Sequence, residues 1–381
     1  MRWTIGLFLF LLTFAGAAQA QAQSQAPQRA GTLISAEPMA SQVAGSKAWR
    51  IRYWTQDETR QPLQVTGLVL APDTPARGSR PVLAWTHGTW GIDQSCSPSL
   101  SPNFWLQTAG LDALAQGMVV VAPDYIGLGG SDVRHPFLSG IPTGQAVLDA
   151  VRAAQAVTGA NAGKRFAVWG ESQGGHAALW TAQVQPTYAP DLELVGAVAA
   201  APPTDLKANL RQAPNATVRT FFTAYIGQSW SDHYDIPLST IAGPQSRRII
   251  GRLAQKCITL NSKPNLATIG GILILHNNMK ATDIAAIQPW ADLSASNSPQ
   301  VAKFTVPLMI AQNPTDQLIA PTVTRTYAQK LCAAGQAVRW VDVNGSGHAT
   351  TAKDSSAASI QWIADRFAGR PPPSDCAALQ R

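Results

Sequence analysis

Short apolar runs alternate along this chain with longer segments of helical periodicity. The apolar runs predict strands at 49–55, 64–71, 81–86, 118–122, 165–169, 194–199, 306–311 and 337–343. Helices are expected at 104–116, 143–158, 173–185, 321–334 and 350–368. Strands that alternate with helices are typical of a mostly parallel sheet covered by helices on both faces. The pattern therefore predicts an α/β fold.

One segment, residues 203–303, breaks this alternation. It contains amphipathic pieces such as RRIIGRLAQK and an apolar piece, IGGILILH. A segment of this length is too long for a loop between two strands. We therefore expect a core made of residues 46–202 and 304–381, with 203–303 inserted as a helical cap. Because ligand crevices in open α/β sheets lie at the carboxyl ends of the strands, the cap is expected to cover the site.

The N-terminus has the pattern of an export signal. An apolar run from Trp3 to Phe14 is followed by Ala18-Gln19-Ala20, a small-residue cleavage pattern. The run is shorter than the roughly 20 residues that span a bilayer. Residues 1–20 are therefore predicted to be a cleaved signal peptide and 21–45 a flexible lead-in, in a secreted or periplasmic protein.

The composition favours a globular protein without nucleic-acid binding. Hydrophobic residues make up 45% of the 381 residues and charged residues only 13%, which suits a large core. The net charge is +7, but the basic residues are scattered and no basic run is interleaved with aromatic residues. We therefore expect no nucleic-acid partner.

Four cysteines, Cys96, Cys257, Cys332 and Cys376, are widely spaced and form no paired metal-ligand motif. In an exported protein such cysteines favour two structural disulfides over a zinc site. Four cysteines allow three connectivities, and the spacing does not separate them.

Gly170-Glu171-Ser172-Gln173-Gly174 follows a predicted strand and opens a predicted helix. This is the context of a nucleophile elbow, in which a serine on a strained strand-to-helix turn projects its hydroxyl at the edge of the sheet. An ordinary strand-to-helix turn that happens to contain a serine is the alternative. The position between strand and helix favours a nucleophile at Ser172.

A serine nucleophile needs a base, and His348 is the strongest candidate. It stands in NGSGHAT, a Gly-rich loop after the last predicted strand, where a histidine could reach over the sheet to Ser172. The alternative for His348 is an ordinary surface histidine. The other histidines have weaker context: helix packing for His176, a place in the cap for His233, and none for His135 and His276.

The acid that orients the base is expected after an earlier strand. Asp316 in IAQNPTDQLIAP follows a predicted strand and precedes a helix. Asp342 is the competitor, but it lies inside a strand and too close along the chain to turn back onto His348. The order Ser172, Asp316, His348 is the order found in α/β-hydrolases.

An oxyanion hole requires two backbone N–H donors. One donor is expected from Gln173, directly after the serine, and the other from the THGTWG turn, with Thr89 first and Gly88 second. His87 in that turn is interpreted as a structural hydrogen-bonding residue. The Gly-rich stretch PDYIGLGGSD lacks a Walker lysine and a G-x-G-x-x-G pattern, so it is read as a turn lining the same crevice.

Together, THGTWG, PDYIGLGGS, GESQGG, the Asp316 loop and GSGH resemble the secretory lipase family of α/β-hydrolases, of the Candida lipase A type. The resemblance extends over roughly residues 50 to 370 and implies an α/β-hydrolase fold with a helical lid over an acyl-binding pocket. It implies triad roles for Ser172, Asp316 and His348, and the disulfides Cys96–Cys257 and Cys332–Cys376. The chain departs from the fungal members in being shorter and in lacking an obvious C-terminal flap.

These observations predict a secreted serine carboxylic-ester hydrolase, a lipase or esterase that needs no metal or organic cofactor. Its expected substrate is a small-molecule or lipid ester, with transient lipid-interface contact through the cap. Two alternatives stay open: a serine peptidase of the prolyl oligopeptidase type, and a non-catalytic lipid- or surface-binding protein on a hydrolase scaffold. The sequence does not indicate the oligomeric state, the acyl length or the alcohol.

Overall fold

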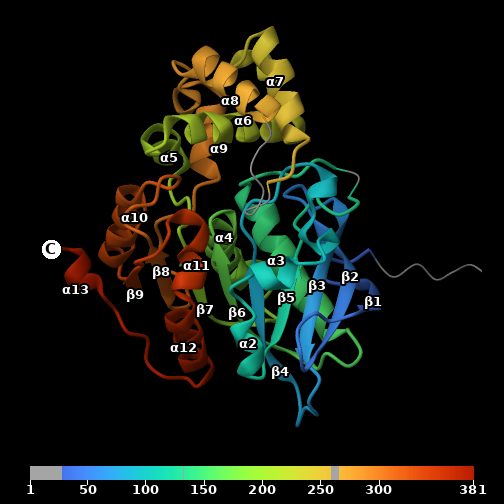
Figure 1. Cartoon of the computed structure of the whole chain (residues 1–381). Helices are drawn as coiled ribbons and strands as arrows, with labels where there is room; N and C mark the ends of the chain where they lie inside the picture. The colour runs from blue at the N-terminus through green and yellow to red at the C-terminus, as the bar shows by residue number, and fades with distance from the viewer. Residues whose placement is uncertain (1–27, 132, 259–265) are drawn as a thin grey trace, which may run out of the picture.

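The structure, a computed structural model, describes residues 28–131, 133–258 and 266–381. Its central element is a nine-stranded sheet with the strand order β1-β2-β3-β5-β4-β6-β7-β8-β9 (Figure 1). The strands are β1 (Leu33–Met39), β2 (Ser46–Gln56), β3 (Pro62–Pro72), β4 (Arg80–Thr86), β5 (Val119–Pro123), β6 (Ala162–Glu171), β7 (Glu193–Ala200), β8 (Leu308–Gln312) and β9 (Val338–Asp342).

The sheet is mostly parallel, as the sequence pattern predicts. Five pairs of neighbouring strands are parallel: β5–β4, β4–β6, β6–β7, β7–β8 and β8–β9. The pairs β1–β2, β2–β3 and β3–β5 are antiparallel. Every residue of β5 and β8 is buried. Strands covered on both faces in this way read as continuous apolar runs.

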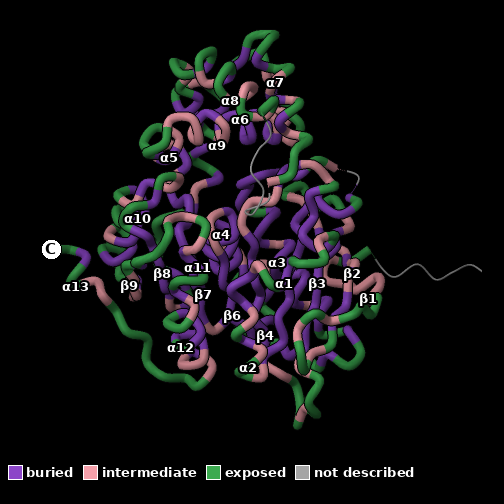
Figure 2. Tube along the Cα trace, in the orientation of Figure 1, coloured by how far each residue is buried: buried purple, intermediate pink, exposed green. Residues whose placement is uncertain are grey.

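Helices cover both faces of the sheet. The helices of the chain are α1 (Phe104–Gln107), α2 (Asp112–Ala115), α3 (Gly140–Gln155), α4 (Gln173–Tyr188), α5 (Leu206–Gln212), α6 (Ala216–His233), α7 (Pro244–Ala254), α8 (Leu266–Met279), α9 (Trp290–Ser296), α10 (Pro321–Ala333), α11 (Thr351–Asp354), α12 (Ser356–Phe367) and α13 (Cys376–Leu379). One apolar core joins the sheet to α3, α4 and α10, and a second joins its other face to α1, α2 and α12. Figure 2 shows both cores as buried chain around the strands.

Three expectations about the elements need correction. Strand β1 lies inside 21–45, the predicted flexible lead-in, because its backbone pairs with β2 at the edge of the sheet although its side chains are only partly buried. The expected helix 104–116 is two short helices, α1 and α2. The expected helix 350–368 is divided between α11 and α12 at Ser355. The predicted signal peptide, 1–20, lies outside the described residues.

Helices α5 to α9 lie between β7 and β8 in the chain and above one end of the sheet (Figure 1). They share an apolar core of their own, in which Trp230 and Trp290 are fully buried. A disulfide between Cys96 and Cys257 joins the loop after β4 to the residues that follow α7, and Cys332 pairs with Cys376. These are the pairs that the resemblance implies. No helix in the described part of the chain is long and apolar enough to cross a membrane.

Candidate active site

Ser172 occupies a strained turn between β6 and α4. Its φ of 56° lies in the left-handed region, which non-glycine residues adopt at an energetic cost. Glycines flank it for steric reasons: a Cβ at Gly170 would lie 1.9 Å from Oγ1 of Thr86, and one at Gly174 would lie 1.9 Å from the Thr86 carbonyl oxygen. The motif therefore packs its backbone directly against β4 and leaves the Ser172 hydroxyl at the carboxyl edge of the sheet.

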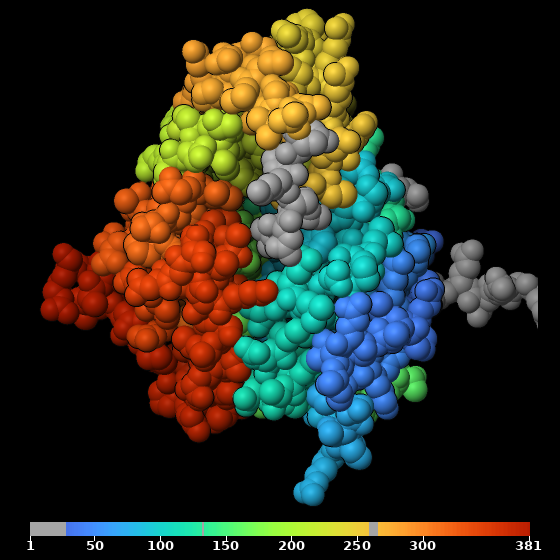
Figure 3. All heavy atoms as spheres, viewed as in Figure 1, coloured from blue at the N-terminus to red at the C-terminus, as the bar shows by residue number. Residues whose placement is uncertain are grey.

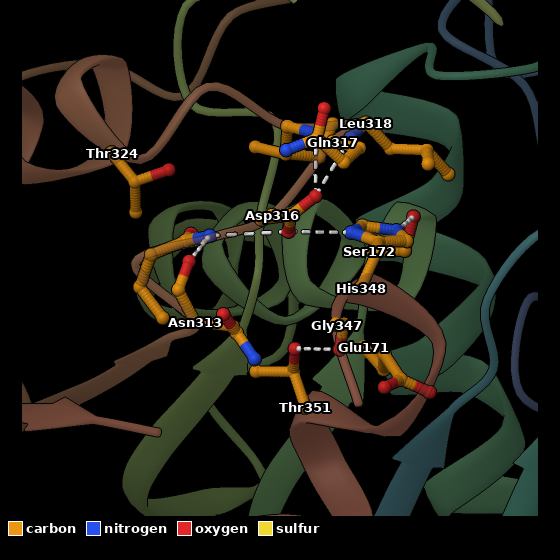
Figure 4. A network of polar contacts seen from close by, with 12 residues as sticks. Glu171, Ser172, Asn313, Asp316, Gln317, Leu318, Thr324, Gly347, His348 and Thr351 are labelled. Atoms are coloured by element: carbon orange, nitrogen blue, oxygen red, sulfur yellow. Dashed lines mark hydrogen bonds and ion pairs between the residues drawn. The ribbon is translucent and has the colours of Figure 1, made fainter. Parts of the chain in front are cut away.

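The structure brings Ser172, His348 and Asp316 into one line of hydrogen bonds (Figure 4). Nε2 of His348 lies 2.8 Å from Oγ of Ser172, and Nδ1 of His348 lies 2.7 Å from Oδ2 of Asp316. The three residues follow the carboxyl ends of β6, β9 and β8, three strands that run parallel. The sheet thus gathers residues that are far apart in the sequence.

The Asp316 carboxylate is held by four hydrogen bonds. Its Oδ1 accepts from the backbone N–H groups of Leu318 (2.8 Å) and Ile319 (3.0 Å), and its Oδ2 accepts from Nε2 of Gln312 (3.1 Å) as well as from His348. Burial by itself raises the pKa of Asp316, but the hydrogen bond and electrostatic attraction to His348 and the backbone hydrogen bonds from Leu318 and Ile319 outweigh it, so the net pKa is lowered. The ionised carboxylate therefore keeps the proton of His348 on Nδ1 and leaves Nε2 to accept one.

Asp342, the competing acid, does not contact His348. Its side chain is exposed, and its Oδ1 accepts a hydrogen bond from the indole N–H of Trp340 at 2.8 Å. The remaining histidines also have partners elsewhere. His176 contacts the Asn297 carbonyl at 2.7 Å, His233 contacts Glu58, and His276 contacts Thr220.

His135 is a site residue that the sequence did not reveal. Its Nδ1–H donates to the Ile126 carbonyl at 2.7 Å, so its Nε2 accepts from the side-chain amide of Gln173 at 2.8 Å. Burial lowers the pKa of His135 to about 3, and the ring is therefore neutral. The two residues are 38 positions apart, and no motif connects them.

Glu171 is a second residue whose role became visible only in the structure. Its Oε1 accepts a hydrogen bond from the backbone N–H of Ala352 at 3.0 Å, which links the elbow to the segment that follows His348. Burial raises the pKa of Glu171 to about 7. In the sequence, only its position next to Ser172 in the G-x-S-x-G pattern could have indicated that Glu171 lies at the site.

Two residues that line the cavity at Ser172 have a backbone N–H group without a partner among the described residues. Within the described ranges, neither the N–H of Gln173 nor that of Thr89 donates to another protein atom. Thr89 lines both cavities beside Ser172, whereas Gly88 lines only one. The side chain of His87 forms a hydrogen bond within the turn, because its Nδ1 lies 2.6 Å from the Gly88 carbonyl oxygen.

Two cavities meet at Ser172 and His348. The first runs beneath α5 and α6; its wall is mainly apolar and includes Leu206, Leu210, Ala213, Phe222 and Ile226. The second lies on the β4 side of the site, and its wall combines aromatic with polar side chains: Trp85, His87, Trp90, Phe104, Gln107, Thr108 and Glu171. A substrate bound across Ser172 could place one half in each cavity.

Comparison with known proteins bears on the family and the fold of the chain. The model of the secretory lipase family matches residues 108–375. Lipase 5 of Candida albicans is 27% identical over 289 residues, which cover 70% of this chain and 59% of that lipase, so the chain spans less than two thirds of its length. A probable inactive lipase of Mycobacterium tuberculosis is 26% identical over 85% of this chain and 74% of its own.

The fold has a solved counterpart in Candida antarctica lipase A. The two structures superpose with a TM-score of 0.73 at 20% identity, over 91% of this chain and 84% of the other. This likeness shows the α/β-hydrolase fold that the strand order and the elbow indicate. Since the family model matches more than half of its residues, the chain belongs to the secretory lipase family.

Proposed function

We propose that this protein is a secreted carboxylic-ester hydrolase in which Ser172 is the nucleophile, His348 the general base and Asp316 the residue that orients the base. The observation that carries the proposal is the hydrogen-bonded line from Asp316 Oδ2 through His348 to Ser172 Oγ, with distances of 2.7 and 2.8 Å. Such a line converts a weakly nucleophilic hydroxyl into a reactive one.

In this mechanism His348 takes the proton of Ser172 as its oxygen attacks the ester carbonyl. The N–H groups of Gln173 and Thr89 hold the negative charge that develops on the carbonyl oxygen. Their lack of another acceptor in the described part of the chain supports this role. His348 then gives its proton to the leaving alcohol. A water molecule activated by the same imidazole hydrolyses the acyl-enzyme and restores Ser172.

The two cavities support a division of the substrate. The apolar cavity under α5 and α6 suits the acyl chain, because burying methylene groups there is favourable. The second cavity, with its polar side chains, suits the alcohol. In this proposal residues 203–303 form the cap of the acyl pocket, and the ester is a lipid or another small molecule. The matched family is one of secretory lipases, and disulfides are typical of exported proteins. Both observations support export of the protein by a signal peptide at residues 1–20.

The test is hydrolysis of p-nitrophenyl esters from acetate to palmitate by the purified protein and by Ser172→Ala. The wild type should turn over at least one ester, and the variant should fall to background while its circular dichroism stays unchanged. Labelling by a fluorophosphonate that disappears in the variant identifies the nucleophile independently. Turnover of Ser172→Ala at the wild-type rate would refute the assignment.

A non-catalytic binding protein on this scaffold is the second candidate, favoured by the relative named as a probable inactive lipase. The same measurements separate it, because a binder would neither turn over an ester nor take the fluorophosphonate label. A peptidase would cleave peptide substrates in preference to esters.

A further inference from the structure

Arg219 places a charge in the wall of the apolar cavity beneath α5 and α6. Among the described residues that line this cavity, Arg219 and His348 of the proposed triad are the only ones with a basic side chain, and none is an aspartate or glutamate. A guanidinium stays protonated at any pH at which the protein is folded. The wall therefore combines an apolar surface with one permanent positive charge.

The helical spacing places this arginine on the side of α6 that faces the cavity. Arg219, Phe222 and Ile226 have the spacing i, i+3, i+7, which puts all three on one face of the helix. All three line the cavity. Arg219 is half-buried, so its side chain is part of the cavity wall and is not a fully solvated surface group.

Arg219 lies toward the end of the cavity that is remote from Ser172. Phe222 lines both cavities, which meet at Ser172, whereas Arg219 lines only the first and lies about one helical turn, roughly 5 Å, closer to the start of α6. Its Nη1 donates to the Arg211 carbonyl, in the last turn of α5, at 2.9 Å. Figures 1 and 3 show the yellow-green residues around α5 at the molecular surface, between the cap helices and the core near α10.

The charge of Arg219 is not neutralised by the protein. Within the described ranges its side chain makes one hydrogen bond, to the Arg211 carbonyl, and it belongs to none of the ion pairs. The side chain of Arg211, by contrast, pairs with Asp283 at 2.9 Å. A guanidinium carries several N–H donors, so Arg219 has donors left for a ligand.

We propose that the cavity beneath α5 and α6 accepts acyl chains that end in a carboxylate, and that Arg219 binds this carboxylate. The preferred substrates are then half-esters of dicarboxylic acids. The guanidinium fork matches the two oxygens of a carboxylate, and the apolar wall buries the methylene groups between the two ends of the chain. This assignment rests on the ester hydrolysis proposed above and names the class of its acyl group. Water cleaves the ester bond to give the alcohol and the dicarboxylic acid, and the distal carboxylate is unchanged.

The test compares two esters that differ in charge and have nearly the same size. p-Nitrophenyl hydrogen adipate ends in a carboxylate, and p-nitrophenyl adipamate ends in a neutral amide. The ratio of kcat/KM for the first ester to that for the second should be about ten in the wild type and about one in Arg219→Gln. Arg219→Lys should keep part of the preference, because the charge remains while the fork is lost.

Arg248→Gln is the matched control. Arg248 is an exposed arginine on α7 that lines neither cavity, so this variant removes the same charge from the cap without changing the wall. Its ratio should equal that of the wild type. A wild-type ratio of about one, a ratio that Arg219→Gln leaves unchanged, or an equal fall in both variants would overturn the inference.

A binding measurement separates this inference from the proposed hydrolysis. Calorimetric titration of Ser172→Ala with monomethyl adipate and with methyl adipamate measures the same charge preference without turnover. A preference that disappears when Arg219→Gln is added supports the role of Arg219, even if no ester is hydrolysed by the wild type. Turnover of p-nitrophenyl hexanoate without any preference for the carboxylate would refute the role of Arg219 and leave the proposed hydrolase activity standing.

Discussion

The side-chain amide of Gln173 donates a hydrogen bond to Nε2 of His135 at 2.8 Å, inside a fully buried cluster. Gln173 is the residue after the proposed nucleophile, and its backbone N–H is one of the two proposed oxyanion donors. The His135 carbonyl in turn accepts a hydrogen bond from Oγ of Ser229 on α6 at 2.6 Å. His135 thus connects the elbow to the helical segment above the site.

This relationship predicts that His135→Phe lowers kcat about tenfold, because an unpaired buried amide allows Gln173 to move and a misplaced oxyanion donor costs part of its contribution. His135 is neutral because burial lowers its pKa to about 3, so the loss should be the same across the pH profile. Ester hydrolysis at several pH values measures it. His276→Phe, which removes a histidine bonded to Thr220 on the cap, is the control and should keep wild-type kcat. An unchanged kcat in His135→Phe would show that Gln173 needs no such support.

Asp316→Asn should lower kcat about 10⁴-fold with little change in KM, because an amide no longer holds the proton of His348 on Nδ1. Asp342→Asn is the matched control, since Asp342 is exposed and bonded to Trp340 rather than to His348. It should retain wild-type turnover. The reverse ranking of the two variants would assign the acid to Asp342.

Glu171→Gln should change how stability depends on pH. Burial raises the pKa of Glu171 from its ordinary value of 4.5 to about 7 in the folded protein. The folded state therefore binds a proton more tightly than the unfolded state, and this contribution to stability is complete below about pH 4.5 and lost as the pH rises through about 7. A glutamine does not titrate, and its oxygen can still accept from Ala352.

The melting temperature of the wild type should consequently fall relative to that of Glu171→Gln between about pH 5 and about pH 8. Thermal unfolding followed by circular dichroism measures this difference. Curves that stay parallel over the range would mean that the Glu171 carboxyl titrates at its ordinary pKa.

Ala213→Phe should shift the preferred p-nitrophenyl ester toward shorter acyl chains. Ala213 is buried in the wall of the apolar cavity beneath α5 and α6, so a phenyl ring there fills space that a long acyl chain would occupy. The ratio of kcat/KM for palmitate to that for butyrate measures the effect. Ala295→Phe on the exposed side of α9 should leave the ratio unchanged. If Ala213→Phe leaves this ratio unchanged, or if only Ala295→Phe lowers it, the acyl chain does not lie in the cavity beneath α5 and α6.

The local pattern of the chain was sufficient for most strands of the sheet and for the elbow. Apolar or β-rich runs predicted eight of the strands. Strands such as β5 and β8 are continuously apolar because they are buried on both faces. Strand β1 was not predicted: its side chains are only partly buried, and its place at the edge depends on backbone pairing with β2, which leaves no apolar signature. Helix ends such as the break at Ser355 were likewise not encoded in periodicity.

For the candidate site, sequence alone determined the residue types and their order, since each of Ser172, Asp316 and His348 follows a recognisable strand. Their 2.7 and 2.8 Å contacts, and the partners of His135 and Glu171, exist because parallel strands end at a common edge and bring distant loops together. The elevated pKa of Glu171 and the lowered pKa of His135 come from burial. Burial of a side chain depends on how distant segments pack around it, so it cannot be read from the local sequence.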